Sequence, residues 1–229
     1  MKSDKIFDSR ESASSALADH IAAVLESAVT QRGNASIVVC GGTSPLATFR
    51  FLRQKKLPWH NITIVPSDER LVPVDHPDSN EGMIRRELMQ DEAAVAQFVS
   101  LATAGTRNKQ QLSGLNAQLN SLVKPIDVVV LGMGHDGHTA SLFPNSVNIS
   151  TALSSDDACV IQHPPHLDDA RLSLTPRLLL AAREIVLLFF GDDKRAIYEQ
   201  AIDAGPVEEL PIRFVLHQEQ VSIRRYWAA

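Results

Sequence analysis

The chain has 229 residues, a length that one domain with a large hydrophobic core can reach. Its formal net charge is -5, from 27 acidic and 22 basic residues, and the lack of a long basic run argues against nucleic acid as a partner. The longest apolar run, residues 185–190, is far too short to span a bilayer, and no apolar segment of a signal peptide follows residues 1–5. We therefore expect a soluble cytoplasmic protein with one domain, residues 1–229.

Helical and strand patterns alternate along the chain. Apolar residues at helical spacing, closed by Gly33, predict a first helix over residues 11–32. Further helices are expected at residues 44–54, 80–89, 109–123 and 193–202. Apolar, β-branched stretches predict strands at residues 35–40, 62–65, 126–131, 158–162, 171–174, 184–190 and 221–226. This alternation, with no strict polar–apolar pattern in the strands, is typical of an α/β fold whose largely parallel sheet carries helices on both faces.

Glycines or charged residues follow four of the predicted strands. Ligands bind beyond the carboxyl ends of the strands in open α/β sheets, so these segments are expected to share one site. The segments are residues 41–45, 67–70, 132–138 and 191–194.

The first segment, Gly-Gly-Thr-Ser-Pro at residues 41–45, suits an anion. Ser44 can cap the next helix and Pro45 fits its first turn, which leaves backbone N–H groups free to face a phosphate. An ordinary strand–helix turn explains these residues equally well. Lys194, in the fourth segment, is a candidate point charge for the phosphate, although an isolated lysine is more often simply solvated.

The second segment, Ser-Asp-Glu-Arg at residues 67–70, places opposite charges directly after an apolar strand. The Arg70 guanidinium can bind an oxyanion or a phosphate, and Asp68 or Glu69 can orient it or handle protons. A surface cluster of ion pairs is the alternative. The position at a strand end favours a functional role.

The third segment opens the most informative stretch, residues 132–144, Gly-Met-Gly-His-Asp-Gly-His-Thr-Ala-Ser-Leu-Phe-Pro. Its glycines let the backbone bend and let a ligand come close. His135 and His138 can exchange protons near neutral pH, and Asp136 can hold the His138 imidazole in one tautomer. A short helix is expected to begin at His138, while a structural role is a fair alternative for His135.

Two other interpretations of this stretch are disfavoured. The pattern GxGxxG also marks dinucleotide sites, but such a site needs a longer helix and an acid at the end of the next strand. His135, Asp136 and His138 lie in a turn without a defined face, and His163 and His166 lie among prolines, so a metal site is not expected. Cys40 and Cys159 form no CxxC pair and are expected to be buried thiols in a reducing compartment.

Together these motifs resemble the 6-phosphogluconolactonase family. The resemblance rests on residues 41–45, on residues 67–70 with Val72-Pro73 and Ser79-Asn80, and on residues 132–144, and it extends to Lys194. It implies the fold of sugar-phosphate isomerases, glucosamine-6-phosphate deaminases and CoA transferases. It also implies hydrolysis of 6-phosphoglucono-δ-lactone to 6-phosphogluconate in the oxidative pentose phosphate pathway, with no metal or organic cofactor.

The resemblance also implies roles for individual residues. His138 falls on the family's general base and Arg70 on the arginine of its Asp-Glu-Arg motif. The phosphate-binding turn of the family falls on Gly42, Thr43 and Ser44. Lys194 and Arg171 match two further ligand-facing cations. The C-terminus departs from the family pattern, W-x-x-D-x-x-A-A, because residues 221–229 lack the acid.

The expected partner is thus a small phosphorylated sugar lactone, bound by a monomer. Neutral His138 takes a proton from the attacking water, Asp136 orients His138, and Arg70 or backbone N–H groups near Gly134 or Gly137 stabilise the oxyanion. The expected phosphate ligands are Gly42, Thr43, Ser44 and a subset of Arg70, Arg171 and Lys194.

Two rival functions remain at this stage. An isomerase or amino-sugar deaminase of the same fold usually carries Asp-Glu-Tyr at residues 68–70 and Asp-Gly-His-Ile-Ala-Phe at residues 136–141, and this chain has neither. A sugar-phosphate sensor that binds without turnover is the second rival, and the presence of His138 and Arg70 argues against it.

Overall fold

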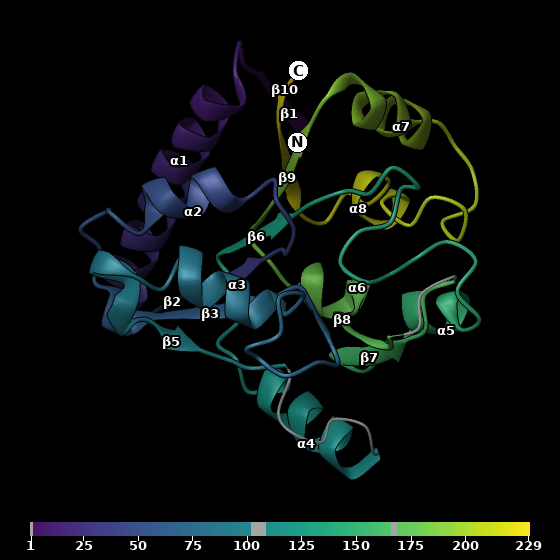
Figure 1. The fold of residues 1–229 in the computed structure, drawn as a ribbon, viewed down its shortest axis with the longest axis horizontal. Coiled ribbons are helices and arrows are strands. Elements are labelled where there is room, and N and C mark those ends of the chain that lie inside the picture. The colour runs from purple at the N-terminus through teal and green to yellow at the C-terminus, as the bar shows by residue number, and fades with distance from the viewer. Residues whose placement is uncertain (1, 102–108, 166–168) are drawn as a thin grey trace.

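The computed structural model describes residues 2–101, 109–165 and 169–229. A seven-stranded sheet crosses the molecule in the order β1-β10-β9-β6-β2-β3-β5, with every neighbouring pair parallel (Figure 1). Its strands are β1 (Lys2–Ile6), β2 (Ala35–Val39), β3 (Ile62–Pro66), β5 (Gln97–Phe98), β6 (Val128–Leu131), β9 (Glu184–Phe190) and β10 (Ser222–Ala228). The predicted α/β fold with a largely parallel sheet is confirmed.

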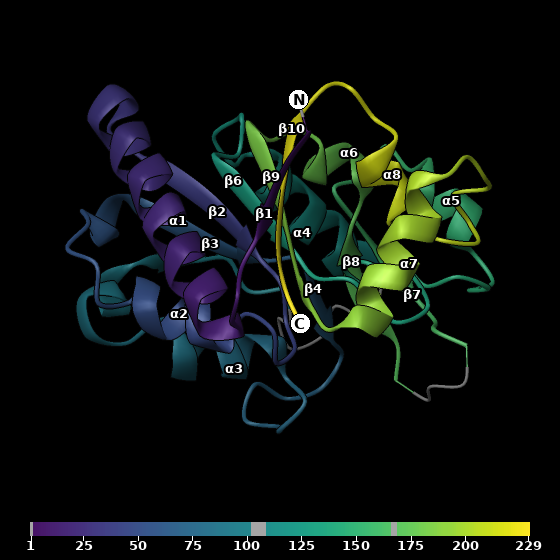
Figure 2. The ribbon, with the colours of Figure 1, turned by 90° about the horizontal axis from the view of Figure 1, so that it is seen from above.

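Helices cover both faces of this sheet, as expected. One face carries α1 (Arg10–Arg32), α2 (Leu46–Leu52) and α3 (Asn80–Glu87). The other carries α4 (Lys109–Asn120), α6 (Pro176–Leu179), α7 (Asp192–Ile202) and α8 (Arg213–Leu216), with α5 (Ile149–Leu153) beyond them. Short 3₁₀ helices lie at η1 (Trp59–Asn61) and η2 (Asp91–Val95). Figure 2 shows α1 to α3 on one side of the strands and α6 to α8 on the other.

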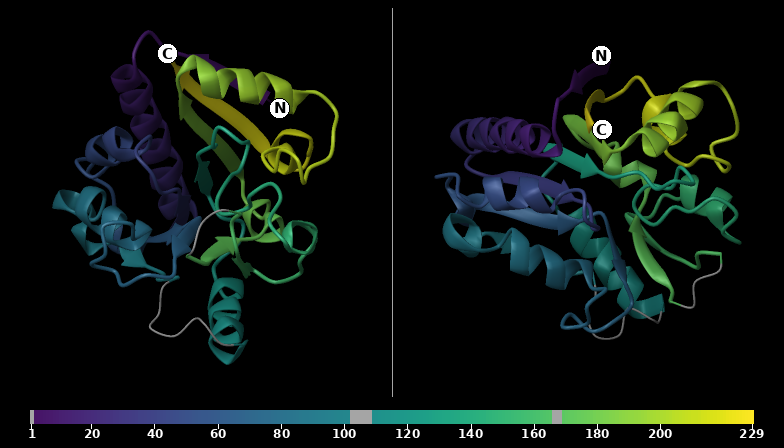
Figure 3. Two further views of the ribbon diagram at one scale, coloured as in Figure 1. Left: turned by 45° about the vertical axis from the view of Figure 1, so that its right-hand side comes forward. Right: turned by 45° about the horizontal axis from the view of Figure 1, so that its top comes forward.

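The central strands explain why their sequences lack strict polar–apolar alternation. In β6, Val128 and Val130 belong to the core under α1 to α3, whereas Val129 and Leu131 belong to the core under α4 and α6 to α8. Successive side chains of a strand point to opposite faces, and here both faces are buried. In the left view of Figure 3, helices lie on both sides of the strands, and the teal helix α4 projects at the bottom.

A second, antiparallel sheet departs from the predicted arrangement. Its order is β4 (Asp68–Arg70), β8 (Arg171–Leu174) and β7 (Cys159–Gln162). Residues 68–70 thus form a strand of their own, and the strands expected at 158–162 and 171–174 lie outside the main sheet. Ser67 joins the two sheets. Its N–H donates to the Val39 carbonyl at 2.8 Å, and its carbonyl accepts from the Leu174 N–H at 2.9 Å.

Two local helix predictions are wrong. Ser44 does not cap α2, because the helix begins two residues later with Pro45 at the N-cap position, after Gly42 has turned the chain at φ +83°. No helix begins at His138. Ala140 has a positive φ of 49°, and the Ser141 N–H donates to the Ser173 hydroxyl instead of a helical carbonyl. Tertiary contacts therefore override the helical pattern there.

The chain's last strand is an interior strand of the main sheet. The strand expected at residues 221–226 is β10, which lies between β1 and β9.

Among the described residues, no helix combines the length and the apolar character needed to cross a membrane.

Candidate active site

A cavity of about 420 Å³ opens at the carboxyl edge of the main sheet, beyond the ends of β2, β3 and β6 and beside the start of α7. The carboxyl ends of parallel strands lie at one edge of a sheet. For this reason, residues from all four segments that follow the predicted strands line the cavity. The predicted site residues that line this cavity are Gly42, Thr43, Ser44, Arg70, His138, Arg171 and Lys194.

Asp136 lies behind His138 and fixes its ring. The His138 Nδ1 lies 2.5 Å from Asp136 Oδ1, and the same oxygen accepts the His138 backbone N–H at 3.1 Å. An ionised carboxylate only accepts, so Nδ1 carries the proton and Nε2 keeps its lone pair in the neutral ring. Burial raises the pKa of Asp136, but the hydrogen bond and charge of His138 outweigh it and lower that pKa overall.

His138 is accessible from the cavity rather than enclosed in the core. Its side chain keeps 31% of its surface exposed, and one ring face packs on Phe143 with centroids 4.3 Å apart. Phe143 therefore holds the ring from one side while Asp136 holds it from another. The imidazole is placed to take a proton from a group in the cavity.

Arg70 and Arg171 face each other across the antiparallel pair β4 and β8. Like charges in this position repel, and burial together with Arg70 lowers the pKa of Arg171. Arg70 is held by the Asp78 carbonyl at 2.5 Å and by Asn80 Oδ1 at 3.1 Å. The Nε atoms of both arginines are buried and make no hydrogen bond within the described chain. An anion between the two guanidinium groups would relieve this repulsion.

The two acids beside Arg70 have structural partners. Asp68 accepts from the Ser67 and Ser141 hydroxyls at 2.7 Å each. Glu69 is fully buried and accepts the backbone N–H groups of residues 70, 80 and 81 at 2.6–2.7 Å. Burial raises the pKa of Glu69 although those N–H donors oppose the shift. Glu69 therefore ties β4 to the start of α3 and does not handle protons in the cavity.

The turn at Gly42 to Ser44 and Lys194 line the same cavity. Because Ser44 caps no helix, its side chain lines the cavity with Thr43. Lys194 lies in the first turn of α7, after the positive-φ turn at Gly191, and makes no ion pair with any described residue. Burial lowers the pKa of Lys194 because it disfavours the charged form.

Two expected oxyanion donors are not available. The Gly134 N–H donates to the His138 carbonyl at 2.9 Å, and the Gly137 N–H donates to the Gly134 carbonyl at 3.2 Å. These hydrogen bonds close the turn that carries His138. In this conformation neither of these two N–H groups is free to stabilise an oxyanion.

The cavity holds no group of metal-ligating side chains. No cluster of three or more His, Cys, Asp or Glu that could bind a metal occurs among the described residues, and His166 lies outside them. Cys40 lies at the cavity wall, and burial raises the pKa of its thiol to about 12, so it is no nucleophile near neutral pH. Cys40 and Cys159 are both buried and free, as expected.

Comparison with known proteins decides the family. Residues 8–224 match the family model described as glucosamine-6-phosphate isomerases/6-phosphogluconolactonase. A 6-phosphogluconolactonase of Rhizobium meliloti is 36% identical, with 97% of each chain covered. One from Pseudomonas aeruginosa is 40% identical over 87% of this chain and 85% of its own. The crystal structure of a 6-phosphogluconolactonase from Shewanella baltica superposes with a TM-score of 0.96 at 36% identity, covering 100% of this chain and 98% of that one.

The chain belongs to this family. The resemblance and the fold expected from the motifs are thereby confirmed, over almost the whole length of the chain.

The C-terminal segment, where the sequence departs from the expected family pattern, still contributes to the site. Trp227 Nε1 donates to the Gly191 carbonyl at 3.1 Å, and the Gly191 N–H donates to the Ala228 carbonyl at 2.9 Å. The tail thus fixes the turn from which α7 and Lys194 begin.

One residue near the reacting groups carried no assigned role in the sequence analysis. Asn80 accepts from Arg70 and donates through Nδ2 to the Asp68 carbonyl at 2.8 Å. It also packs so closely on Gly41 that a Cβ there would lie 2.0 Å from Asn80 Oδ1. Its only local signal is its position after the helix cap Ser79.

Proposed function

We propose that the chain hydrolyses 6-phosphoglucono-δ-lactone to 6-phosphogluconate. One observation carries the proposal: His138, oriented by Asp136, lines the same cavity as Thr43, Ser44 and Lys194. A base and an anion-binding group can thus reach the two ends of one small molecule. Curated 6-phosphogluconolactonases that match this chain over almost its whole length support the activity.

The reaction begins with general-base attack. His138 Nε2 takes a proton from a water molecule as the water oxygen adds to the lactone carbonyl carbon, and the carbonyl oxygen becomes an oxyanion. When the tetrahedral intermediate collapses, the bond to the ring oxygen breaks, and the protonated imidazole returns its proton to that oxygen. The single product is the ring-opened hydroxy acid, 6-phosphogluconate, and His138 is neutral again. A lactone is a reactive cyclic ester, so no covalent nucleophile is needed.

Cationic and hydroxyl side chains of the cavity bind the negatively charged groups of the substrate. Thr43, Ser44 and Lys194 hold the phosphate together with the turn at Gly42, and Arg171 contributes from β8. Arg70, fixed by Asn80 and the Asp78 carbonyl, stabilises the oxyanion. No step in this mechanism requires a metal or an organic cofactor. The proposal further includes a single catalytic domain, residues 1–229, that acts as a cytoplasmic monomer.

A rapid assay with freshly prepared lactone tests the proposal. The rate of acid release is measured against the spontaneous rate without enzyme, because the lactone also hydrolyses in water. We expect release far above this background with catalytic amounts of enzyme. A rate equal to the background would contradict the proposal.

The same preparation is then given glucosamine-6-phosphate, with ammonia as the readout. The proposal predicts no ammonia, since Arg70 stands where the deaminases of this fold usually carry a tyrosine. Ammonia release without lactone hydrolysis would favour the deaminase. Binding of 6-phosphogluconate with neither reaction would favour a sensor.

A further inference from the structure

A second and larger cavity adjoins the active site. It measures about 870 Å³, and it shares Thr43, Ser44, His135 and Lys194 with the active-site cavity. Three of these four residues form the phosphate-binding group of the proposed function. The larger cavity therefore borders the residues to which the proposed function assigns the phosphate.

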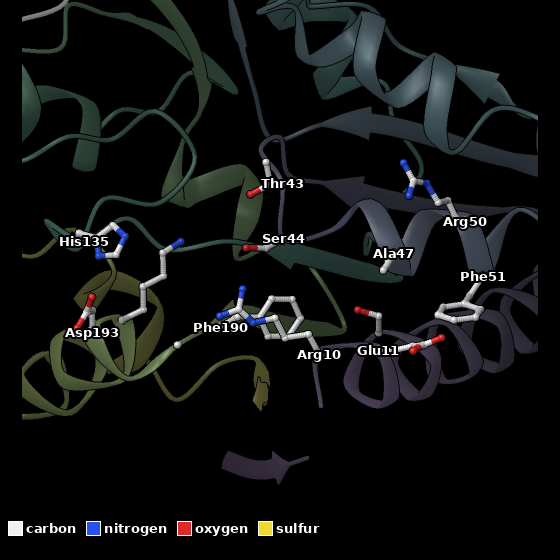
Figure 4. Close-up of a pocket in the computed structure, with 13 residues that line it drawn as sticks. Arg10, Glu11, Thr43, Ser44, Ala47, Arg50, Phe51, His135, Phe190 and Asp193 are labelled. Atoms are coloured by element: carbon white, nitrogen blue, oxygen red, sulfur yellow. The ribbon is translucent and has the colours of Figure 1, made fainter. Parts of the chain in front are cut away.

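Arg10 lies next along this larger cavity, beside Phe190 (Figure 4). Its Nε donates to the Ala229 carbonyl at 3.0 Å, and its guanidinium lies over the Phe190 ring, 5.6 Å from the centroid. These contacts fix the side chain. Its two terminal nitrogens make no hydrogen bond with any described residue, so they can bind a second anionic group.

The far end of the cavity has a different chemistry. Figure 4 shows Ala47, Phe51, Arg50 and Glu11 there, on α1 and α2. Glu87 holds Arg50 at 2.7 and 3.2 Å, whereas the Glu11 carboxylate makes no contact with a described polar group. Phe51 offers a partly exposed ring, on which a planar group can stack. A carboxylate beside an aromatic ring suits a ribose and its base.

We propose that this second cavity binds a nucleoside diphosphate. One phosphate lies at Thr43, Ser44 and Lys194, and the other at Arg10. Glu11 accepts hydrogen bonds from the ribose hydroxyls, and the base stacks on Phe51. The cavity volume falls in the range of about 300–1,000 Å³ that small-molecule sites occupy. The inference rests on the phosphate-binding part of the proposed function, so the nucleotide competes with the lactone.

Calorimetry with ADP, AMP and inorganic phosphate tests the site. We expect ADP to bind at least tenfold more tightly than inorganic phosphate, with AMP between them. ADP should displace bound 6-phosphogluconate and raise KM for the lactone without changing kcat. Equal dissociation constants for ADP and inorganic phosphate would overturn the proposal.

Variants at the far end locate the binding. Phe51→Leu keeps an apolar side chain but loses the stacking surface, and we expect it to weaken ADP about tenfold while inorganic phosphate binds as before. Glu11→Gln should weaken ADP and leave phosphate unchanged. Glu26→Gln is the matched control, because Glu26 is exposed on the same helix and lies outside the cavity. ADP binding that neither Phe51→Leu nor Glu11→Gln weakens would place the nucleotide elsewhere and overturn the inference.

Ala47→Trp places a bulky side chain in the larger cavity, at a position that does not line the active-site cavity. It should abolish the advantage of ADP over phosphate and leave lactone turnover intact, and persistent tight ADP binding in a folded variant would contradict the proposal. Because ADP binding is measured directly, the two proposals can fail separately. Tight ADP binding that these variants remove, without lactone hydrolysis, would sustain this inference and reject the proposed reaction.

Discussion

Gly134 has no room for a side chain. A Cβ at this position would lie 2.2 Å from His138 Nδ1 and 2.6 Å from Asp136 Oδ1. We therefore expect Gly134→Ala to push the imidazole away from its carboxylate and to lower kcat by about 100-fold or more, as for loss of the general base. Steady-state kinetics on the lactone measure this effect.

Gly132→Ala is the control, since a Cβ there would lie 3.8 Å from Cys40 Sγ, an ordinary contact. The control should keep wild-type kcat. If Gly134→Ala also keeps it, the close approach of Gly134 to His138 has no catalytic consequence.

We expect substrate binding to depend on pH through Lys194. Burial lowers the pKa of Lys194, so the amine loses its proton at a lower pH than an ordinary lysine, whose pKa is about 10.4. The affinity for 6-phosphogluconate should therefore fall with rising pH before that value is reached. Lys194→Gln should weaken binding by roughly tenfold or more at neutral pH and remove this alkaline fall.

Titration calorimetry from neutral to alkaline pH gives both quantities. Lys55→Gln serves as the control, because Lys55 pairs with Asp19 on the surface. An alkaline fall that survives in Lys194→Gln would assign the titration to another group.

At the scale of elements, β10 holds the start of α7 in place. The Trp227 N–H donates to the Gly191 carbonyl, and the Arg195 guanidinium lies 4.9 Å from the Trp227 ring centroid. Trp227→Phe keeps an aromatic ring but loses the N–H. We expect KM to rise about three- to tenfold, the effect of one lost hydrogen bond that positions Lys194, with kcat nearly unchanged.

Trp59→Phe is a matched control, because the Trp59 N–H donates to the Lys55 carbonyl at 2.9 Å and neither residue lines the active-site cavity. Its KM should stay at the wild-type value. An equal rise in both variants would indicate a general loss of stability instead of positioning.

The helices and strands differ in how well the sequence predicts them. Long periodic or apolar stretches, such as α1 and β9, are predicted almost to the residue because their local pattern and their burial agree. The sheet change at Ser67 has no local signal, since it depends on hydrogen bonds to Val39 and Leu174 far along the chain. The pairing of Arg70 with Arg171 across β4 and β8 therefore could not be predicted from the sequence.

At the scale of the whole molecule, a cluster of charged side chains joins α1, β9 and β10. His20 Nε2 lies 2.6 Å from Glu184 Oε2, and Arg224 hydrogen-bonds the other oxygen. Burial raises the pKa of Glu184, but these two partners outweigh burial and lower it overall. A depressed pKa stabilises the fold above the unfolded pKa, about 4.3, and this stabilisation is lost as the pH falls through the folded value.

We expect Glu184→Gln to cost about 2 kcal/mol of unfolding free energy at neutral pH. The variant should also show a smaller loss of stability than the wild type between about pH 5 and pH 3. Urea unfolding at several pH values measures both effects. Glu199→Gln, which removes an exposed pair with Arg195, should behave as the wild type. An unchanged acid slope in Glu184→Gln would exclude this cluster as a source of acid sensitivity.

At the same scale, part of the site could be predicted, because the glycine-rich or charged segments that follow parallel strands all lie at one edge of the sheet. His138, Lys194 and the turn at Gly42 follow parallel strands or open the next helix, so topology alone brings them together. The occupied N–H groups of Gly134 and Gly137 were not predictable, because the turn closes through a hydrogen bond with the His138 carbonyl.

We propose that His138 is the general base in a cavity whose cations bind the phosphate of the same molecule. Kinetics of His138→Ala on freshly prepared 6-phosphogluconolactone, with spontaneous hydrolysis subtracted, test it most directly. We predict that kcat falls by about 100- to 10,000-fold while KM stays nearly unchanged, because the base is lost and the phosphate site remains. Wild-type turnover in this variant would contradict the account.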